Sequence, residues 1–270
     1  MDTLMAKAGS GAGDMVLSLN IAHTWAVYYK TDVELEYHWK EKQDFKEMPQ
    51  DPETVAERMD DMKTRMANPD RVEVIHLFDS DIFFTQGDPS MWEGTQEALV
   101  RRLDYLPVRW FFPRNPPLKI PFEARYMWSE APRITKTIVT WDSSENSKTL
   151  RQSKKTRNDW GYMRDYIQDK FPEHKIISLS YRDSFDTAYN AIRDCEFCFG
   201  YEGMWHLVAE NFGKLLICLT EQKPFYTATP DARILNGEAV LAYIDGISNK
   251  NRLEQEQTLM YNVWQGNIPR

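Results

Sequence analysis

The chain has 270 residues, of which 42% are hydrophobic and 27% are charged, and its formal net charge is -8 at pH 7. This much apolar surface excludes an intrinsically disordered chain. The acidic balance disfavours a protein that coats nucleic acid with a broadly basic surface, although a local basic groove stays compatible with it. The length predicts one large domain or two modest ones, and we expect two.

The first half of the sequence alternates between strand and helix patterns. Apolar periodicity predicts strands and helices in the order β-α-β-α-β, over residues 3–8, 14–30, 32–39, 51–68 and 71–78. A further helix is predicted over 90–106. Such alternation is typical of a mostly parallel sheet covered by helices, so the predicted fold class is α/β.

A proline-rich stretch separates this half from a second one with the same alternation. Residues 113–135 contain five prolines, which break regular structure and suit a linker. We therefore expect a first domain over 1–115, a linker over 116–135 and a second domain over 136–250. A last helix, within 251–270, is expected to pack back on the first domain. The second domain is predicted to contain strands and helices over 136–142, 159–171, 175–181, 184–195, 196–200, 203–213 and 214–220.

The three cysteines are Cys195, Cys198 and Cys218, and this sparse, odd number predicts free thiols in a reducing compartment. Cys195 and Cys198 have the C-x-x-C spacing of a redox or zinc pair. A closed zinc site needs about four ligands, and the sequence has no second such pair, so buried structural thiols are the favoured interpretation. No apolar run approaches the roughly 20 residues that cross a bilayer, so we expect no membrane span and a cytoplasmic location.

Three glycine turns or polar loops stand where strands give way to helices, the usual place for ligands in parallel sheets. The first is "AGSGAGDMV", which fits neither the Walker A nor the Rossmann glycine spacing but brings Asp14 to the start of a helix. Asp14 either caps that helix or offers its carboxylate to a substrate.

The second is the loop over 146–157, which has five basic residues and no acidic one. Such a loop is either a solvated surface feature or a site for a diphosphate. The residues that would neutralise the phosphates are Lys148, Lys154, Lys155 and Arg157.

The third is the turn at Gly203, where freed backbone N–H groups would face an anion. Glu202, His206 and Glu210 follow one another at four-residue spacing and so lie along one face of the helix. A carboxylate here would accept hydrogen bonds from sugar hydroxyls. The alternative for His206 is a structural helix histidine.

Together, these segments resemble the GT-B class of glycosyltransferases, and within it the ADP-heptose heptosyltransferase family. The stretches that carry the resemblance are "GAGDMVLSLN", "KKTRNDWGYMRDYI" and "GMWHLVAENFGKLLICL". The resemblance covers about half of the chain and is weak in the middle. Tyr201 stands where that family has an aspartate, and Glu202 and Glu210 have the E-x7-E spacing of retaining GT-B enzymes. The two signals imply opposite stereochemical outcomes, so inversion and retention both remain open.

The resemblance implies two facing Rossmann-like domains, with a nucleoside diphosphate sugar held mainly by the second. It implies that Asp14 is the general base, and that Lys155 and Arg157 stabilise the leaving diphosphate together with the helix start at Gly203 and Met204. The other implied donor contacts are Lys148, Lys154, Glu202, His206 and Glu210.

The resemblance also implies catalysis without a metal ion or other cofactor. Asp79 and Asp81 have the D-x-D spacing of the metal-dependent glycosyltransferase class, but they lie far in sequence from the basic loop. We therefore expect no metal role for them.

Acceptors in this class include lipid-linked sugars, proteins and hydroxymethylated bases in bacteriophage DNA. We expect either such a base, in which case the enzyme acts in the host cytoplasm, or a soluble glycan. The implied acceptor contacts are Gly13, Arg109 and Trp110, although residues 100–115 equally suit core packing. The alternatives to a glycosyltransferase are a nucleotide-sugar epimerase of the same fold and a non-catalytic binding scaffold. The sequence predicts neither the sugar nor the oligomeric state.

Overall fold

A computed structural model of the chain describes residues 4–9, 12–39, 52–78, 111–113, 127–141, 154–180, 183–200, 204–219, 233–235, 244–255 and 257. The chain divides into two compact units, Met1–Glu130 and Ala131–Arg270. The division falls inside the proline-rich segment predicted as a linker.

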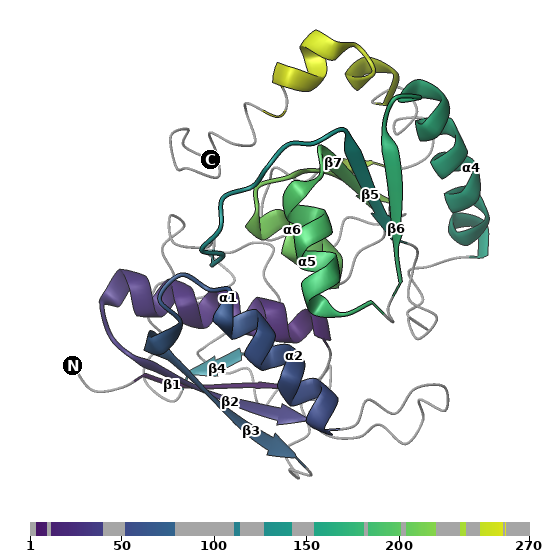
Figure 1. Cartoon of the computed structure of the whole chain (residues 1–270). Helices are drawn as coiled ribbons and strands as arrows, with labels where there is room; N and C mark the ends of the chain where they lie inside the picture. Colours follow the sequence, from purple (N-terminus) through teal and green to yellow (C-terminus); the bar gives the residue numbers. More distant parts are fainter. Residues whose placement is uncertain are drawn as a thin grey trace. The chain divides into compact units, whose positions relative to one another are not determined.

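The first unit contains a four-stranded sheet with the strand order β3-β2-β1-β4. Its strands β1 to β3 are parallel, and β4 pairs with β1 in the antiparallel sense. Helices α1 and α2 lie on the same face of the sheet (Figure 1), because both right-handed crossovers move across the sheet in one direction. The elements are β1 (Leu4–Gly9), α1 (Ala12–Tyr29), β2 (Val33–Trp39), α2 (Pro52–Thr64), a 3₁₀ turn (Pro69–Arg71), β3 (Val72–Phe78) and β4 (Phe111–Pro113).

The core of this unit follows the expected periodicities. Val33, Leu35 and Tyr37 of β2 are buried on the face that α1 covers, as a period of two requires. From α1, buried apolar side chains recur every three or four residues, as on one face of a helix: Met15, Val16, Leu19, Ala22 and Ala26.

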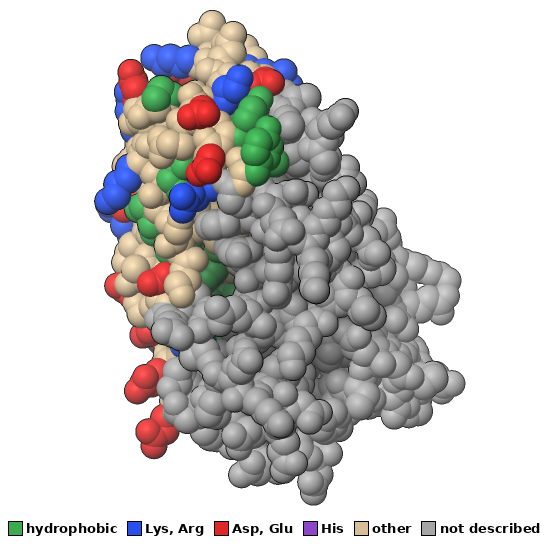
Figure 2. All heavy atoms as spheres, turned by 90° about the vertical axis from the view of Figure 1, so that its right-hand side faces the viewer, with side chains coloured by type: hydrophobic (Ala, Val, Ile, Leu, Met, Phe, Trp, Pro, Cys, Tyr) green, Lys and Arg blue, Asp and Glu red, His purple; other side chains and the backbone are tan. Residues whose placement is uncertain are grey.

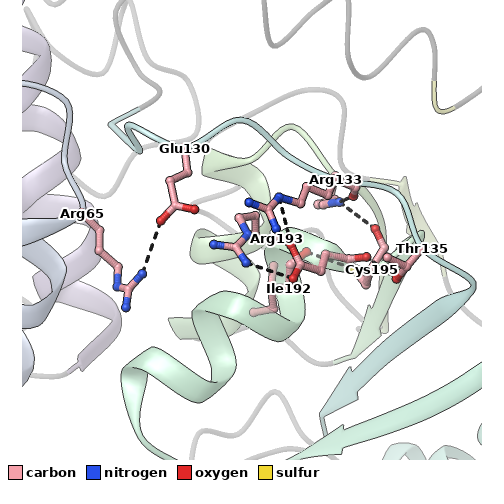
Figure 3. Close-up of polar contacts among 9 residues, drawn as sticks. Arg65, Glu130, Arg133, Thr135, Ile192, Arg193 and Cys195 are labelled. Carbon is pink, nitrogen blue, oxygen red and sulfur yellow. Dashed lines mark hydrogen bonds and ion pairs between the residues drawn. The ribbon is translucent and has the colours of Figure 1, made fainter.

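Residues 127–130, which we call the strap, are fastened to the end of α2. The backbone N–H of Ala67 donates to the carbonyl of Met127 at 2.6 Å, and that of Ser129 donates to the carbonyl of Arg65 at 2.9 Å. The Arg65 guanidinium also lies 3.5 Å from the Glu130 carboxylate (Figure 3). The strap therefore belongs to the first unit.

The chain is fastened to the second unit almost immediately afterwards. The backbone N–H of Arg133 donates to the carbonyl of Arg193 at 2.9 Å, and that of Thr135 donates to the carbonyl of Asp194 at 3.1 Å. Only Ala131 and Pro132 separate the strap from these contacts.

The second unit contains a five-stranded parallel sheet with the order β6-β5-β7-β8-β9. Its elements are β5 (Thr137–Trp141), α4 (Lys154–Lys170), β6 (Lys175–Leu179), α5 (Phe185–Asp194), β7 (Phe197–Gly200), α6 (Met204–Asn211), β8 (Leu215–Leu219) and β9 (Arg233–Leu235). In Figure 1, α4 covers one face of this sheet, and α5 and α6 cover the other. The helices divide in this way because the crossover from β5 to β6 moves in the opposite direction to the later ones.

The described part of the C-terminal segment packs on this second unit. Ile244, Ile247 and Leu253 are buried in one hydrophobic cluster with α4 side chains such as Ile167, and with residues of β5, β7 and β8. Tyr166 donates a hydrogen bond from its hydroxyl to Asp245 at 2.7 Å, which adds a polar link to α4. We expected the segment 251–270 to pack on the first domain. Among its described residues, however, Leu253 packs in the core of the second unit.

The predicted α/β class with mostly parallel sheets is confirmed. Two short strands, β4 and β9, were not predicted, and α4 begins at Lys154 rather than at Asp159. The helix predicted over 90–106 lies outside the described residues.

Candidate functional site

The strand order of the second sheet changes direction between β5 and β7. The chain enters at β5, adds β6 on one side and then crosses back to add β7 on the other side. The helices that follow β5 and β7, α4 and α6, therefore cover opposite faces of the sheet, and such a switch point is the usual ligand position in parallel sheets. The two strands end level with each other, at Trp141 and Gly200, which are register partners.

Trp141 and Gly200 are the last residues of β5 and β7 and lie directly beneath this switch point. A Cβ atom placed on Gly200 would lie 2.5 Å from Cε2 of the Trp141 indole, far inside contact distance. Trp141 is 3% exposed, so its indole packs on the backbone of Gly200 and has almost no contact with solvent. Only glycine at position 200 permits this contact. The sequence reasoning missed both residues, although a glycine that ends an apolar strand, in "FCFG", is the signal that would have found Gly200.

Both loops that the sequence analysis singled out in the second domain follow, in sequence, the two strands that flank this switch point. The basic loop follows β5, and the turn at Gly203 follows β7. The structure thus brings the starts of α4 and α6 to the same edge of one sheet, although they are about 50 residues apart in sequence.

The start of α4 is basic. Lys154, Lys155 and Arg157 lie within its first four residues, and no acidic residue does. Cations at a helix N-terminus are disfavoured by the helix dipole, so this arrangement suits an anion bound nearby. Lys148 lies outside the described residues.

The structure describes only part of the predicted site at the start of α6. Met204 begins the helix and is half-buried. Glu202 and Gly203 lie outside the described residues.

His206 and Glu210 are buried and lie against each other. Their side chains are 1% and 2% exposed, and Nε2 of His206 is 3.1 Å from Oε1 of Glu210. We predicted that both would face a ligand, whereas every residue from Trp205 to Asn211 is buried. An α-helix that is buried on every side contacts protein on every side. Within α6, the pair of His206 and Glu210 stabilises the first two turns.

Asp14 and Gly13 lie in the first turn of α1, in the first unit. The helix begins at Ala12, so Asp14 is its third residue. A carboxylate at this position is favoured by the helix dipole. The other predicted acceptor residues, Arg109 and Trp110, lie outside the described residues, as do Asp79 and Asp81.

Charge on the described surface is mixed. In the face drawn in Figure 2, Lys and Arg side chains are interspersed with Asp and Glu. Within the described ranges, no three His, Cys, Asp or Glu side chains are grouped as a metal site would require. Among the same described residues, no helix has the length and hydropathy of a bilayer span.

A scan against models of protein families, a search of curated proteins and a search of solved structures each found no match to this chain.

Proposed function

We propose that the chain is a glycosyltransferase of the GT-B type, which binds a nucleoside diphosphate sugar at the switch point of its second unit. One observation carries the proposal: the basic start of α4 and the N-terminus of α6 leave the same edge of the sheet, on either side of Trp141 and Gly200. A diphosphate is the ligand whose charge suits both features.

In this proposal, the protein supplies the charge that stabilises the leaving group. Departure of the nucleoside diphosphate leaves negative charge on its terminal phosphate. Lys155 and Arg157 would neutralise that charge, with Lys148 and Lys154 beside them, and the amides at Gly203 and Met204 would donate to it. No metal ion is needed for this role. Glu202 would accept hydrogen bonds from sugar or ribose hydroxyls. The buried pair of His206 and Glu210 would stabilise α6 without contacting the donor.

The proposed general base is Asp14, which would take the proton from an acceptor hydroxyl as that oxygen attacks the anomeric carbon. The proposed acceptor is a hydroxymethylated base of DNA or a soluble glycan. Arg109 and Trp110 would stack on it or pair with it, with Gly13 allowing close approach of the backbone.

Donor binding is the first experiment. Thermal unfolding of the whole chain is followed with a panel of nucleoside diphosphate sugars. A ligand present at one hundred times its dissociation constant stabilises the protein by about 2.7 kcal/mol. We expect one donor to raise the melting temperature in this way, and we expect the double variant Lys155→Glu, Arg157→Glu to lose the effect.

The matched control is Lys175→Glu, an exposed cation at the opposite end of the strands, at the start of β6. It should keep the donor effect. If no nucleotide sugar shifts the melting temperature, or if both charge reversals reduce the shift equally, the proposed donor site is wrong.

Transfer is the second experiment. Asp14→Asn should retain donor binding but lower the rate of transfer by roughly 10²- to 10⁴-fold, the usual contribution of a general base. The exposed Asp32→Asn, just beyond the other end of α1, is the control and should transfer normally. Mass spectrometry of DNA carrying hydroxymethylated bases, and of soluble glycans, detects the product. Conversion of one donor sugar into another without acceptor would indicate an epimerase instead.

A further inference from the structure

The amino-terminal edge of the second sheet, opposite the proposed donor site, contains a buried pair of thiols. Cys195 follows the last residue of α5, and Cys198 is the second residue of β7. Both are fully buried, and their Sγ atoms are 3.3 Å apart, the distance of a thiol hydrogen bond. The Cys195 thiol also donates a hydrogen bond to the carbonyl oxygen of Ile192 at 3.1 Å.

A buried lysine lies beside this pair. Lys214 is 6% exposed, and its Nζ donates to the carbonyl oxygen of Cys195 at 2.6 Å and to that of Arg133. A tight turn places it there. Gly213 has a left-handed φ of 61°. The N–H of Lys214 donates to the carbonyl of Ala209, and this hydrogen bond closes the C-terminal end of α6.

The charge of Lys214 calls for a compensating anion, because an isolated ammonium in a protein interior is costly. No carboxylate lies within ion-pair distance of its Nζ among the residues that the structure describes. Burial lowers the pKa of Lys214, while the nearby thiols and the more distant Asp194 carboxylate act in the opposite direction.

The two thiols respond differently to their surroundings. Burial would raise the pKa of the Cys195 thiol, but the hydrogen bond from Cys198 and the charge of Lys214 outweigh it, so that this pKa is lowered. Burial and the contact with Cys195 raise the pKa of Cys198 well above its ordinary value. Cys195 is therefore the more acidic thiol of the pair.

We propose that Cys195 and Cys198 are a redox-active dithiol, with Lys214 as a positioning residue, and that a small hydroperoxide oxidises them to a disulfide. The Cys195 thiolate attacks the peroxide, which forms an S–O bond, breaks the O–O bond and releases hydroxide. The Cys198 sulfur then attacks the sulfenic sulfur of Cys195, so that the S–S bond forms and the S–O bond breaks. The oxygen leaves as water with the Cys198 proton. Two thiols and one hydrogen peroxide yield one disulfide and two waters.

The geometry suits this chemistry in two ways. A disulfide needs about 2.05 Å between its sulfurs, so closure requires little more than about 1 Å of movement. Since two residues separate the cysteines, the resolving thiol is held at high effective concentration. Full burial restricts the oxidant to a molecule near the size of water, as hydrogen peroxide is.

The experiment treats the whole folded protein with hydrogen peroxide, without nucleotide, then unfolds it and alkylates every free thiol. Intact mass is measured at each time. We expect the wild type to lose two alkylation sites together and to recover them with dithiothreitol. Cys218→Ser, which removes the third cysteine, is the matched control and should lose its two remaining sites at the same rate. Cys195→Ser and Cys198→Ser should form no internal disulfide.

Lys214→Met keeps a long side chain but removes the charge. It should slow disulfide formation about tenfold at neutral pH, which corresponds to a rise of about one unit in the pKa of the attacking thiol. The pH at which the rate levels off should move upward by the same amount, a change that loss of stability alone would not produce.

Two results would overturn the proposal. One is that all three cysteines stay fully alkylated after peroxide treatment of a protein that still melts cooperatively. The other is that oxidation occurs only as fast as global unfolding, so that its rate rises in parallel with unfolding when urea is added.

Discussion

At the scale of single residues, the contact between Trp141 and Gly200 fixes how closely β5 and β7 approach beneath the proposed donor site. Gly200→Ala would place a methyl group where the indole now lies, with 2.5 Å to its nearest atom. We expect a loss of about 1–3 kcal/mol in the free energy of unfolding, the usual cost of overpacking a core. Urea unfolding, monitored by near-UV circular dichroism, measures it.

Gly246→Ala is the matched control for this substitution. Its added methyl would meet the guanidinium of Arg252 at 2.6 Å, but Arg252 is an exposed and flexible side chain that can move. The change should be close to neutral. Equal losses in the two variants would show that backbone flexibility, and not the indole contact, determines the effect.

Asp194 provides a prediction about pH. Arg193 donates two hydrogen bonds to its carboxylate, at 2.6 and 2.9 Å, and these lower the pKa of Asp194. A lowered folded-state pKa contributes stability above the unfolded value of about 3.9, and this stability is lost as the pH falls through the folded-state pKa. Asp194→Asn should therefore cost stability at neutral pH, by no more than about 1 kcal/mol for so exposed a carboxylate.

The measurement is urea unfolding of both proteins from pH 7 downward. The difference between wild type and Asp194→Asn should begin to shrink below about pH 4, where the unfolded-state aspartate takes up its proton. It should vanish only below the lower folded-state pKa, where both states are protonated. A difference that stays constant with pH would mean that packing, and not the charge of Asp194, is responsible.

At the scale of elements, α5 begins with a side-chain cap. The Ser184 hydroxyl accepts a hydrogen bond from the backbone N–H of Thr187 at 3.1 Å. Ser184→Ala should cost about 1 kcal/mol of unfolding free energy, because one N–H at the helix start loses its partner. Ser184→Asp restores an acceptor and should retain most of the stability. A loss of the same size in both variants would argue against capping.

Most elements could be predicted because their patterns are local. The buried face of α5 is formed by Phe185, Ala188, Tyr189 and Ile192, a spacing that is visible in the sequence. The strands β4 and β9 were missed because each has only three residues, too few to show a periodic pattern. The early start of α4 was missed because basic residues are disfavoured in a first helical turn.

The same distinction applies to the site. The strands β5 and β7 and the helices that follow them could be predicted because their apolar patterns are local. The burial of His206 and Glu210 could not, because it depends on what packs around α6 from elsewhere in the chain. The contact of Lys214 with Cys195 joins residues 19 positions apart through a turn at Gly213, and local periodicity does not encode such contacts.

At the scale of the whole molecule, the second unit depends on a segment that follows its last described strand. Leu253 is 5% exposed within the cluster that includes α4. Leu253→Ala should reduce the free energy of unfolding by about 2–4 kcal/mol, because it leaves a cavity that the helices cannot fill. Gln255→Ala, at an exposed position two residues further on, is the control and should change it by no more than about 0.5 kcal/mol.

Calorimetry is the suitable measurement, since two units can unfold in separate transitions. We expect Leu253→Ala to lower the transition of the unit that contains α4. If only the other transition moved, the packing of the C-terminal segment on the second unit would be contradicted.

The short join at Ala131 and Pro132 has a practical consequence. None of the hydrogen bonds described above involves either residue, and the strap on one side and Arg133 on the other keep theirs when the backbone is opened between them. The peptide bond between Ala131 and Pro132 is therefore the rational position at which to split the gene and express the two halves as separate fragments.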